Sequence, residues 1–500
     1  MKTTNKLLLA AGAISLYSCT TATSKNADKP NVIFILVDDL GKEWVDEYGA
    51  EGISLPHLQE LADESMIFNR AYSMPQSTPS RVALMTSQYP YNNGWINHYD
   101  VPRWGYGAQY DVENNPCFPR QIQENGYKTC VTGKWQLNDF RLQPNIMNDL
   151  GFDEYFMWTG AESGNEKISG ERYWNPYIHS TEGSKVYEGA FGPDLYCKFI
   201  TDFIDKNHKD PMFIYYPMTL THSPFVHTPH KMDAKSNYQK HIAMTEYMDI
   251  IVGRIVKSLK DNGVYDNTYI MFTTDNGTSG ACVGIRNGVI VRGGKTKLSE
   301  NGINCPFMVK TPKSNKKVES NALIDFTDVG PTIIEITGSK RMKERVDGVS
   351  FANVLSGKVT QSDKGYALSM GGSPAMIDGD KRVKNITTFR DRTIIGEQYK
   401  IIVDLDRSIN RVYDIVNDPF ERNNLVGDAK VMAAVERELG AVIKALPAQD
   451  QHPKYDVIPH DPALDYDLNS QSDSKRDPRS GFTPTATQEE YDRFVYGKKK

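Results

Sequence analysis

The stretch Asn31-Val-Ile-Phe-Ile-Leu-Val37 is a continuous apolar run that ends abruptly in Asp38 and Asp39. A run that is apolar at every position is typical of a parallel-sheet strand buried on both faces. Similar runs that end in polar residues occur at 127–132, 212–216 and 269–273. Amphipathic stretches lie between them, at 81–86, 119–125, 195–206 and 243–262. This alternation predicts an α/β fold with a large, mostly parallel sheet sandwiched by helices.

The pattern changes beyond about Gly365. Short alternating runs follow at 392–395, 400–403 and 411–414, and then comes a helical stretch at 431–446. These segments predict a smaller α+β subdomain of antiparallel strands and one helix. We therefore expect a main domain at 30–364 and a C-terminal subdomain at 365–460. Residues 461–500, rich in Asp, Ser, Pro and Arg, predict an extended arm.

Composition disfavours two classes of function. The 500-residue chain has 58 Lys plus Arg against 63 Asp plus Glu, a net charge of −5, so no excess of basic residues indicates a nucleic-acid partner. A hydrophobic fraction of 39% is enough for a core and is well below that of an integral membrane protein. Five cysteines beyond the first thirty residues are widely scattered, which allows one disulfide at most and favours buried thiols.

The chain begins with the features of an export signal. The apolar run Leu7–Leu16 follows Lys2 and Lys6 and is too short to span a bilayer. The sequence Leu16-Tyr17-Ser18-Cys19 resembles a bacterial lipobox whose cysteine is acylated, although Tyr17 is bulkier than the usual small residue. We expect residues 1–29 to be a signal peptide. The mature protein is then periplasmic, or lipid-anchored through Cys19 at the outer membrane or cell surface; the alternative is an ordinary secretory signal.

Two acidic pairs follow two of the expected strands. Asp38 and Asp39 end the first apolar run, and Asp275 and Asn276 end the fourth. Ligands gather at the carboxyl ends of parallel strands, so neighbouring strands would bring these oxygen ligands together. Buried carboxylates need a neutralising cation, and oxygen ligands without clustered His or Cys favour Ca²⁺ or Mg²⁺ over zinc. The alternative for each pair is a helix cap or a turn.

The sequence Ser77-Thr-Pro-Ser-Arg81 suggests a nucleophile beside a helix N-terminus. Proline fits the first turn of a helix, so Ser77 would lie just before it, where backbone N–H groups favour negative charge. Arg81 would lie one turn further on and could hold an anionic oxygen. A capped helix start without chemistry is the alternative interpretation.

Taken together, these motifs resemble those of the type I sulfatases, the formylglycine-dependent branch of the alkaline phosphatase superfamily. Ser77 to Arg81 matches the first half of the family's signature, whereas Met85-Thr86-Ser87-Gln88 departs from its second half. Further motifs follow in the family's order from about residue 30 to 430: Asp38-Asp39, Gly133-Lys134-Trp135, Thr221-His222-Ser223-Pro224, Asp275-Asn276-Gly277, Gly294-Lys295 and Glu300-Asn301-Gly302. The resemblance implies an alkaline phosphatase-like fold and a sulfuric ester hydrolase.

The resemblance also assigns roles residue by residue. It implies one Ca²⁺ held by Asp38, Asp39, Asp275 and Asn276. It implies that Ser77 is oxidised to formylglycine, whose hydrate attacks sulfur with one hydroxyl and expels sulfate with the other. Arg81 would stabilise that hydrate, Lys134 and Lys295 would hold sulfate oxygens, and His222 would donate a proton to the leaving alcohol. A serine-type signature further implies an anaerobic sulfatase-maturating enzyme as partner.

One position departs from the family pattern. Where the family usually has Lys-x-His, this chain has Lys134-Trp135-Gln136. Glutamine forms hydrogen bonds but carries neither a proton for transfer nor a charge. Gln136 therefore puts the usual activation of the nucleophile in doubt and leaves open a catalytically weak protein.

The substrate is expected to be a sulfated oligosaccharide, from a host glycan or an algal polysaccharide. Aromatic rings stack on the apolar faces of sugars, and charged groups bind hydroxyls and sulfates. The candidate residues are His98, Arg103, Trp104, Trp158, Arg172 and His227. Two alternatives stay open: a phosphoesterase of the same superfamily with an unmodified nucleophile, and a non-catalytic glycan-binding lipoprotein.

Overall fold

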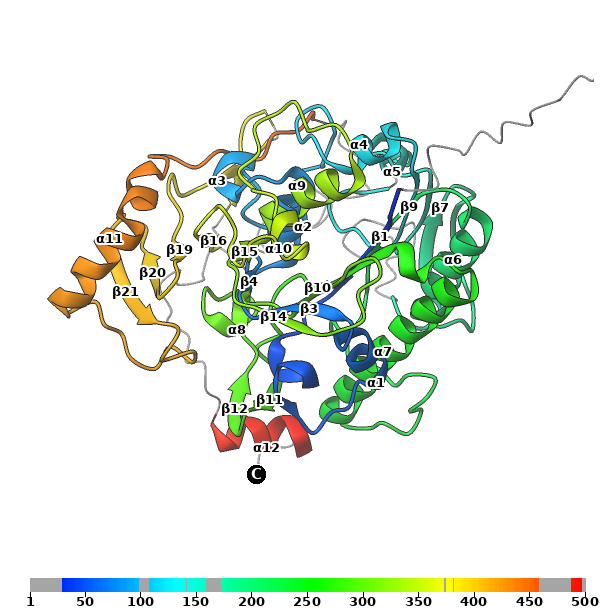
Figure 1. Cartoon of the computed structure of the whole chain (residues 1–500), viewed down its shortest axis with the longest axis horizontal. Helices are drawn as coiled ribbons and strands as arrows, with labels where there is room; N and C mark the ends of the chain where they lie inside the picture. The colour runs from blue at the N-terminus through cyan, green and yellow to red at the C-terminus, as the bar shows by residue number, and fades with distance from the viewer. Residues whose placement is uncertain are drawn as a thin grey trace, which may run out of the picture.

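The computed structural model describes residues 29–98, 108–140, 142–158, 172–372, 375–380, 382–457 and 487–496. The expected signal peptide with Cys19 lies outside these residues. A ten-stranded sheet forms the centre of the molecule (Figure 1). From edge to edge its strands are β14 (Val318–Ser320), β3 (Ser65–Phe68), β13 (Phe307–Lys310), β10 (Thr268–Thr274), β1 (Asn31–Val37), β9 (Met212–Pro217), β5 (Lys128–Lys134), β6 (Glu154–Trp158), β7 (Tyr177–Ser180) and β8 (Gly183–Val186).

The middle of this sheet is parallel. Strand β1 pairs in parallel with β10 on one side and β9 on the other, and β5 continues the parallel order to β6. Strands β13 and β7 add antiparallel pairs toward the two edges. All seven residues of β1 are buried, as its uninterrupted apolar run predicts. The predicted mixed, mostly parallel α/β sheet is confirmed.

Helices cover both faces of the sheet because alternate side chains of each strand point to opposite faces. Val32, Phe34 and Leu36 pack on one face against α2 (Ser77–Thr86), α4 (Pro119–Glu124), α5 (Ile146–Asp149), α9 (Phe326–Thr337) and α10 (Ala352–Leu355). Ile33, Ile35 and Val37 pack on the other against α1 (Pro56–Ala62), α6 (Gly192–Asn207) and α7 (Asn237–Asp261). The sheet is thus the middle layer of three.

Short elements connect these layers. A three-stranded sheet consists of β2 (Ala50–Glu51), β11 (Val283–Arg286) and β12 (Val289–Arg292), and β4 (Ala71–Tyr72) pairs with β15 (Ile324–Asp325). The remaining short helices here are η1 (Lys42–Trp44), η2 (Asp46–Tyr48), α3 (Pro90–Asn93), η3 (Tyr265–Asn267) and α8 (Glu300–Ile303).

The C-terminal part forms the predicted antiparallel sheet with one helix. Its strand order is β16 (Ala367–Met370), β19 (Arg392–Ile395), β20 (Tyr399–Val403) and β21 (Ile409–Asp414), and α11 (Ala429–Ala445) packs on it (Figure 1). A separate pair joins β17 (Ala375–Ile377) to β18 (Val383–Asn385). Leu368, Ile394, Ile401, Val412 and Leu439 belong to a core that the four-stranded sheet shares with α2 and neighbouring residues of the main domain.

The expectation of an extended arm at 461–500 is wrong for its described part. Residues Gln488–Tyr496 form helix α12, which lies near β11 and β12 in Figure 1. Arg292 Nη1 and Glu490 Oε1 are 2.6 Å apart and join the helix to β12. The polar composition predicted an extended arm there, but a short amphipathic helix contacts the main domain.

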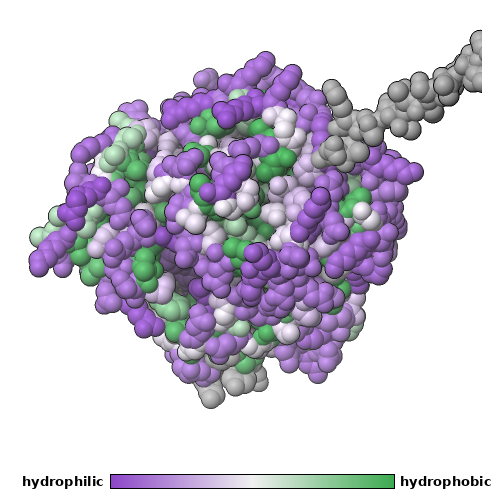
Figure 2. Space-filling model, in the orientation of Figure 1, coloured by the Kyte–Doolittle hydropathy of each residue, from purple (hydrophilic) through white to green (hydrophobic). Residues whose placement is uncertain are grey.

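The surface and the cysteines are those expected of a globular protein. On the face drawn in Figure 2 hydrophilic residues dominate, and hydrophobic ones occur in small scattered groups. Within the described ranges, no helix is both long enough and apolar enough to cross a bilayer. Cys117, Cys130, Cys197, Cys282 and Cys305 are all buried and free.

A buried ion pair in the C-terminal subdomain gives a test of its packing. Arg392 is fully buried, and its Nη2 donates to both carboxylate oxygens of Asp450 at 2.8 Å. Asp450→Ala leaves the guanidinium without its counter-charge and should lower the free energy of unfolding by about 3–5 kcal/mol in urea titrations. Glu436→Ala breaks the exposed pair with Lys444 and should change it little. Equal effects of the two variants would contradict this assignment.

Candidate active site

The residues that sequence analysis singled out meet at one end of the sheet. Asp38 and Asp39 follow β1, Lys134 ends β5, and Asp275 and Asn276 follow β10. Because these strands are parallel neighbours or near neighbours, their carboxyl ends point the same way. His222 follows β9 at the same edge, and the backbone N–H of Thr221 donates to Asp38 O at 2.8 Å.

Ser77 lies at the centre of this group. It is the first residue of α2 rather than the residue before it, and it is 5% exposed. Its Oγ is 3.3 Å from Asp38 Oδ1 and 3.4 Å from Asn276 Oδ1. A hydroxyl held between two oxygen ligands is placed to share a cation with them.

Each buried carboxylate has a cation from another segment. Lys134 Nζ is 2.7 Å from Asp38 Oδ2, and Lys295 Nζ is 2.7 Å from Asp39 Oδ2. Arg81 Nη2 is 2.8 Å from Asp275 Oδ2, and Nη1 donates to Lys134 O at 2.8 Å. Burial opposes ionisation of Asp38, but the charges of Lys134 and His222 outweigh it and lower the pKa of Asp38 to about 2. Asp38 is therefore ionised at neutral pH.

Backbone geometry before Lys134 requires glycine. Gly133 has φ of +113°, and a Cβ there would stand 2.1 Å from Pro217 O on the neighbouring strand β9. Only a residue without a side chain lets β5 approach β9 so closely at this point. The Gly-Lys pair of the motif thus places the lysine amine beside Asp38.

His222 points one ring nitrogen into the site. Its Nδ1 is 2.6 Å from Ser223 O, and since a carbonyl only accepts, Nδ1 carries the proton. Nε2 then faces Asp39 Oδ2 at 3.6 Å. Burial, and next the positive charge of Lys295, lower the pKa of His222 to about 4. The sequence predicted a pKa near neutrality for His222. Burial of the ring beside Lys295 explains the lower value.

Gln136 occupies the position that the family usually gives to histidine. It is buried, has φ of +59°, and its backbone O accepts from Thr78 Oγ1 at 3.2 Å. Its Oε1 is buried and has no hydrogen-bond partner within the described part of the chain. A buried, unsatisfied amide oxygen next to Ser77's helix is suited to accept a hydrogen bond from a group bound in the site.

Arg172 belongs to the centre, although sequence analysis placed it in an outer loop. Its guanidinium lies 4.1 Å from the ring centre of Trp158, and Nη1 is 4.0 Å from Asp38 Oδ2. Trp158 is 1% exposed and so supports Arg172 rather than offering a face to a sugar. The sequence did not predict this contact, because it joins Trp158, at the end of β6, to Arg172, which follows a long insertion.

Two of the other predicted substrate residues, His227 and His98, lie within the described part of the chain. His227 is half-buried; its backbone O accepts from Trp174 Nε1 at 3.1 Å, and the two rings are 5.5 Å apart. His98 is half-buried at the end of a described segment. Arg103 and Trp104 lie outside the described residues. Their proposed contacts with substrate stay predictions.

Sequence analysis also missed the approach of the C-terminal subdomain. A Cβ on Gly372 would stand 3.2 Å from Asn97 Oδ1 and 3.5 Å from Gln76 Nε2. Gln76 directly precedes Ser77, so the segment after β16 borders the site. Local sequence patterns do not reveal a contact between Gln76 and Gly372, which are nearly three hundred positions apart.

The donor set fits a divalent cation. Asp38, Asp39 and His222 each offer a ligand atom, and these atoms lie within 4.8 Å of one another. Asn276 Nδ2 is 2.8 Å from Asp39 Oδ1, so its amide is adjacent. The predicted ligand Asp275 lies close, but its Oδ2 is paired with Arg81 and its Oδ1 accepts from Asp39 N at 3.1 Å. Carboxylate and amide oxygens favour a hard cation such as Ca²⁺.

Metal binding should show in thermal stability. Adding Ca²⁺ to protein treated with EDTA should raise the free energy of unfolding, by about 2.7 kcal/mol at a hundredfold excess over Kd. Asp39→Asn removes one charged ligand and should abolish most of the shift in melting temperature, whereas Asp202→Asn, at an exposed site on α6, should keep it. An unchanged shift in Asp39→Asn would contradict this site.

Comparisons with known proteins agree with this geometry. A sulfatase family model matches residues 30–339, and a model for the N-sulphoglucosamine sulphohydrolase C-terminal region matches residues 294–449. An N-acetylgalactosamine-6-O-sulfatase of Bacteroides thetaiotaomicron is 26% identical, covering 89% of this chain and 99% of the relative. An ulvan-active sulfatase of Formosa agariphila is 25% identical, covering 85% and 82%.

Solved structures share the fold. The crystal structure of Ps i-CgsB in complex with k-i-k-neocarrahexaose aligns with a TM-score of 0.67 at 23% identity, covering 85% of this chain and 94% of that chain. The family model spans more than half of the sequence and includes every strand end described above. The chain therefore belongs to the sulfatase family and is a type I sulfatase of the alkaline phosphatase superfamily.

Proposed function

We propose that this sulfatase removes O-sulfate from a sulfated carbohydrate, a host glycan or an algal polysaccharide, with formylglycine made from Ser77 and a bound Ca²⁺. The observation that carries the proposal is the position of Ser77 Oγ between Asp38 and Asn276, with Lys134 and Lys295 paired to the neighbouring carboxylates. The named relatives act on N-acetylgalactosamine-6-O-sulfate and on ulvan, which supports a carbohydrate without choosing one.

The residues around Ser77 suit transfer of a sulfuryl group. Lys134, Lys295 and Arg172 bring three positive charges close to Asp38 and Asp39, where they would hold sulfate oxygens as negative charge moves onto them. Formylglycine, once hydrated, supplies a second hydroxyl through which sulfate can be expelled. Arg81, fixed by Asp275 and by Lys134 O, would orient the side chain at position 77 from one turn along α2.

His222 would serve the leaving alcohol. Nδ1 is fixed as a donor by Ser223 O, so Nε2 is the atom that takes up and gives a proton. In the free site its pKa is held low by burial and by Lys295. The negative charge of a bound sulfate ester beside Lys295 would offset that lysine and raise the pKa of His222 toward neutrality, which suits proton donation.

The rival activities have less support. A phosphoesterase of this superfamily uses two metals, whereas the described residues hold one group of three His, Cys, Asp or Glu ligands close enough for an ion. A non-catalytic binder would rest on Gln136 alone. The intact cluster of Asp38, Lys134, His222 and Lys295 argues for catalysis.

The proposal extends to maturation and location. An anaerobic sulfatase-maturating enzyme would oxidise Ser77 before the chain folds, since the residue is almost fully buried in the structure. Export to the periplasm, with a lipid anchor at Cys19, would place the enzyme where polymeric glycans are met.

The first test is the state of residue 77. Protein co-produced with an anaerobic maturating enzyme should lose about 2 Da at Ser77, the mass of two hydrogens, in peptide mass spectrometry. Ser77→Ala should show no mass change and should lose turnover of sulfated sugars by at least about a thousandfold, because no nucleophile remains. Turnover by protein with an unmodified Ser77 would move the assignment to a phosphoesterase-type mechanism.

Gln136 gives a second test. Gln136→Leu keeps the side-chain volume but removes hydrogen bonding, and should lower kcat by about tenfold with little effect on KM. Gln136→His should keep activity and add an ionisation to the pH dependence of kcat, near pH 6.5 for an unperturbed ring. If Gln136→Leu matches the wild type at every pH, the amide takes no part in the reaction.

A further inference from the structure

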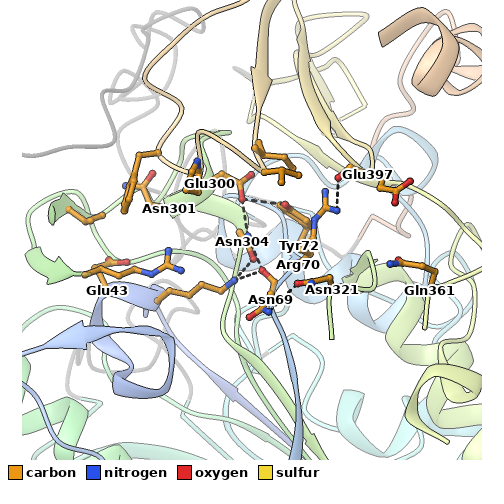
Figure 3. A pocket seen from close by; sticks show the side chains of 17 residues that line it. Glu43, Asn69, Arg70, Tyr72, Glu300, Asn301, Asn304, Asn321, Gln361 and Glu397 are labelled. Carbon is orange, nitrogen blue, oxygen red and sulfur yellow. Dashed lines mark hydrogen bonds between the residues drawn. The ribbon is translucent and has the colours of Figure 1, made fainter. Parts of the chain in front are cut away.

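Buried tyrosine hydroxyls join segments of this protein that are distant in the sequence. Tyr72 is one example: its hydroxyl donates to Glu300 Oε2 at 3.2 Å, beside a cavity between the main domain and the C-terminal subdomain (Figure 3). Tyr173, which is 1% exposed, forms a contact of the same kind. Its acceptors differ, because they are main-chain oxygens of the loop that carries His222.

The Tyr173 hydroxyl is shared between two carbonyl groups of this loop, which follows β9. It donates to Thr219 O at 2.7 Å and also to His222 O. A phenol has one proton and a carbonyl oxygen only accepts, so both oxygens converge on the same hydroxyl. One side chain therefore holds both ends of the segment 219–222.

The other side of the loop is bonded to the end of β1. The N–H of Thr221 donates to Asp38 O, and the N–H of Asp38 donates to Leu220 O, both at 2.8 Å. These bonds fix the middle of the segment, and His222 follows them in the chain. Tyr173 adds a contact to the main chain of His222 itself.

The main chain here also sets the direction of the imidazole ring. Nδ1 of His222 donates to Ser223 O at 2.6 Å, and Nε2 then lies 3.6 Å from Asp39 Oδ2. The oxygen that Tyr173 binds belongs to the peptide group between His222 and Ser223. A shift of that peptide group would move the ring, because the ring is bonded to the next one.

Tyr173 is itself held by tight packing at the start of α6. Its ring packs on Phe191 with the ring centres 6.3 Å apart, and its carbonyl oxygen accepts from the N–H of Gly192. Glycine is required at 192, because a Cβ there would stand 2.4 Å from Arg172 O. The hydroxyl is thus presented to the loop from a well-packed position.

The residues on either side of Tyr173 contact the same region. Arg172 Nη1 is 4.0 Å from Asp38 Oδ2, and Trp174 Nε1 donates to His227 O, further along the loop, at 3.1 Å. The three consecutive residues therefore contact the catalytic centre and two parts of the loop after β9.

We propose that Tyr173 is a positioning residue for His222: its hydroxyl holds the peptide group after His222 and so keeps Nε2 directed at the leaving alcohol. This inference rests on the proposed function, in which His222 gives that proton. When the S–O bond to the sugar breaks, its electron pair stays on the alcohol oxygen, which takes the proton from Nε2. A displaced ring transfers that proton more slowly.

The test is Tyr173→Phe in the matured enzyme, which removes the hydroxyl and keeps the ring. Two substrates are compared: N-acetylgalactosamine 6-O-sulfate, whose alcohol needs a proton to leave, and 4-nitrophenyl sulfate, whose phenol leaves readily as the anion. Tyr173→Phe should lower kcat/KM about tenfold for the sugar sulfate and less than about twofold for the aryl sulfate. His222→Ala should show the same split with a loss of at least about a hundredfold for the sugar sulfate. A role in packing alone would lower kcat/KM equally for both substrates.

Tyr48→Phe is the matched control. Tyr48 is also buried, and its hydroxyl donates to two main-chain oxygens, Phe307 O at 2.8 Å and Phe68 O at 3.3 Å. Its loss should lower the melting temperature much as Tyr173→Phe does, because each variant loses buried hydrogen bonds. The ratio of kcat/KM for the two substrates should stay within about twofold of the wild type, since this contact is not made to the His222 loop.

Amide hydrogen exchange tests the contact without any substrate. In protein carrying Ser77→Ala, adding Tyr173→Phe should speed exchange in peptides covering 219–223 at least about threefold, and adding Tyr48→Phe should not. Unchanged exchange in these peptides would overturn the proposal.

The two substrates also separate failure of this proposal from failure of the proposed function. A split in His222→Ala without one in Tyr173→Phe would overturn the positioning role alone. No split in His222→Ala would overturn the proton-donor role of His222, and the positioning role with it. With both roles correct, adding Tyr173→Phe to His222→Ala should cause no further loss, because Tyr173 acts through His222.

Discussion

Three buried carboxylates at the ends of β1 and β10 are the constraint on which the rest of this site depends. Asp38, Asp39 and Asp275 are all at most 3% exposed, and none could stay ionised there alone. Each is held by a cation from a different segment: Lys134 from β5, Lys295 from the loop after β12, and Arg81 from α2. The charge pairs therefore bring strand, loop and helix together at one point.

The same arrangement would suit the binding of both a metal and an anion. A divalent cation among the carboxylates would compete with Lys134 and Lys295 for the same oxygens. The two amines would then be available for a negatively charged ester close to Ser77. Binding of metal and of sulfate would thus reinforce each other, since each relieves a charge imbalance that the other creates.

Much of this architecture could be predicted from the sequence, because buried parallel strands have a distinctive apolar pattern. Strand β1 spans the predicted residues Asn31–Val37 because an all-apolar run between polar ends has one stable location, the centre of a parallel sheet. The gathering of Asp38, Asp39, Asp275 and Asn276 followed from strand polarity alone. The pKa of His222 and the place of Arg172 were not readable, because both depend on what packs around them from distant segments.

The C-terminal subdomain is joined to the loop that carries Lys295. Lys400 in β20 is fully buried, and its Nζ is 3.0 Å from Glu300 Oε1 and 2.7 Å from Glu421 Oε1. Glu300 begins α8, only five residues beyond Lys295. A subdomain fixed to that turn by a buried ion pair limits how far the lysine can move. The local sequence of the small sheet predicted its strands, but only the folded chain shows that one of its lysines fixes the loop that carries Lys295.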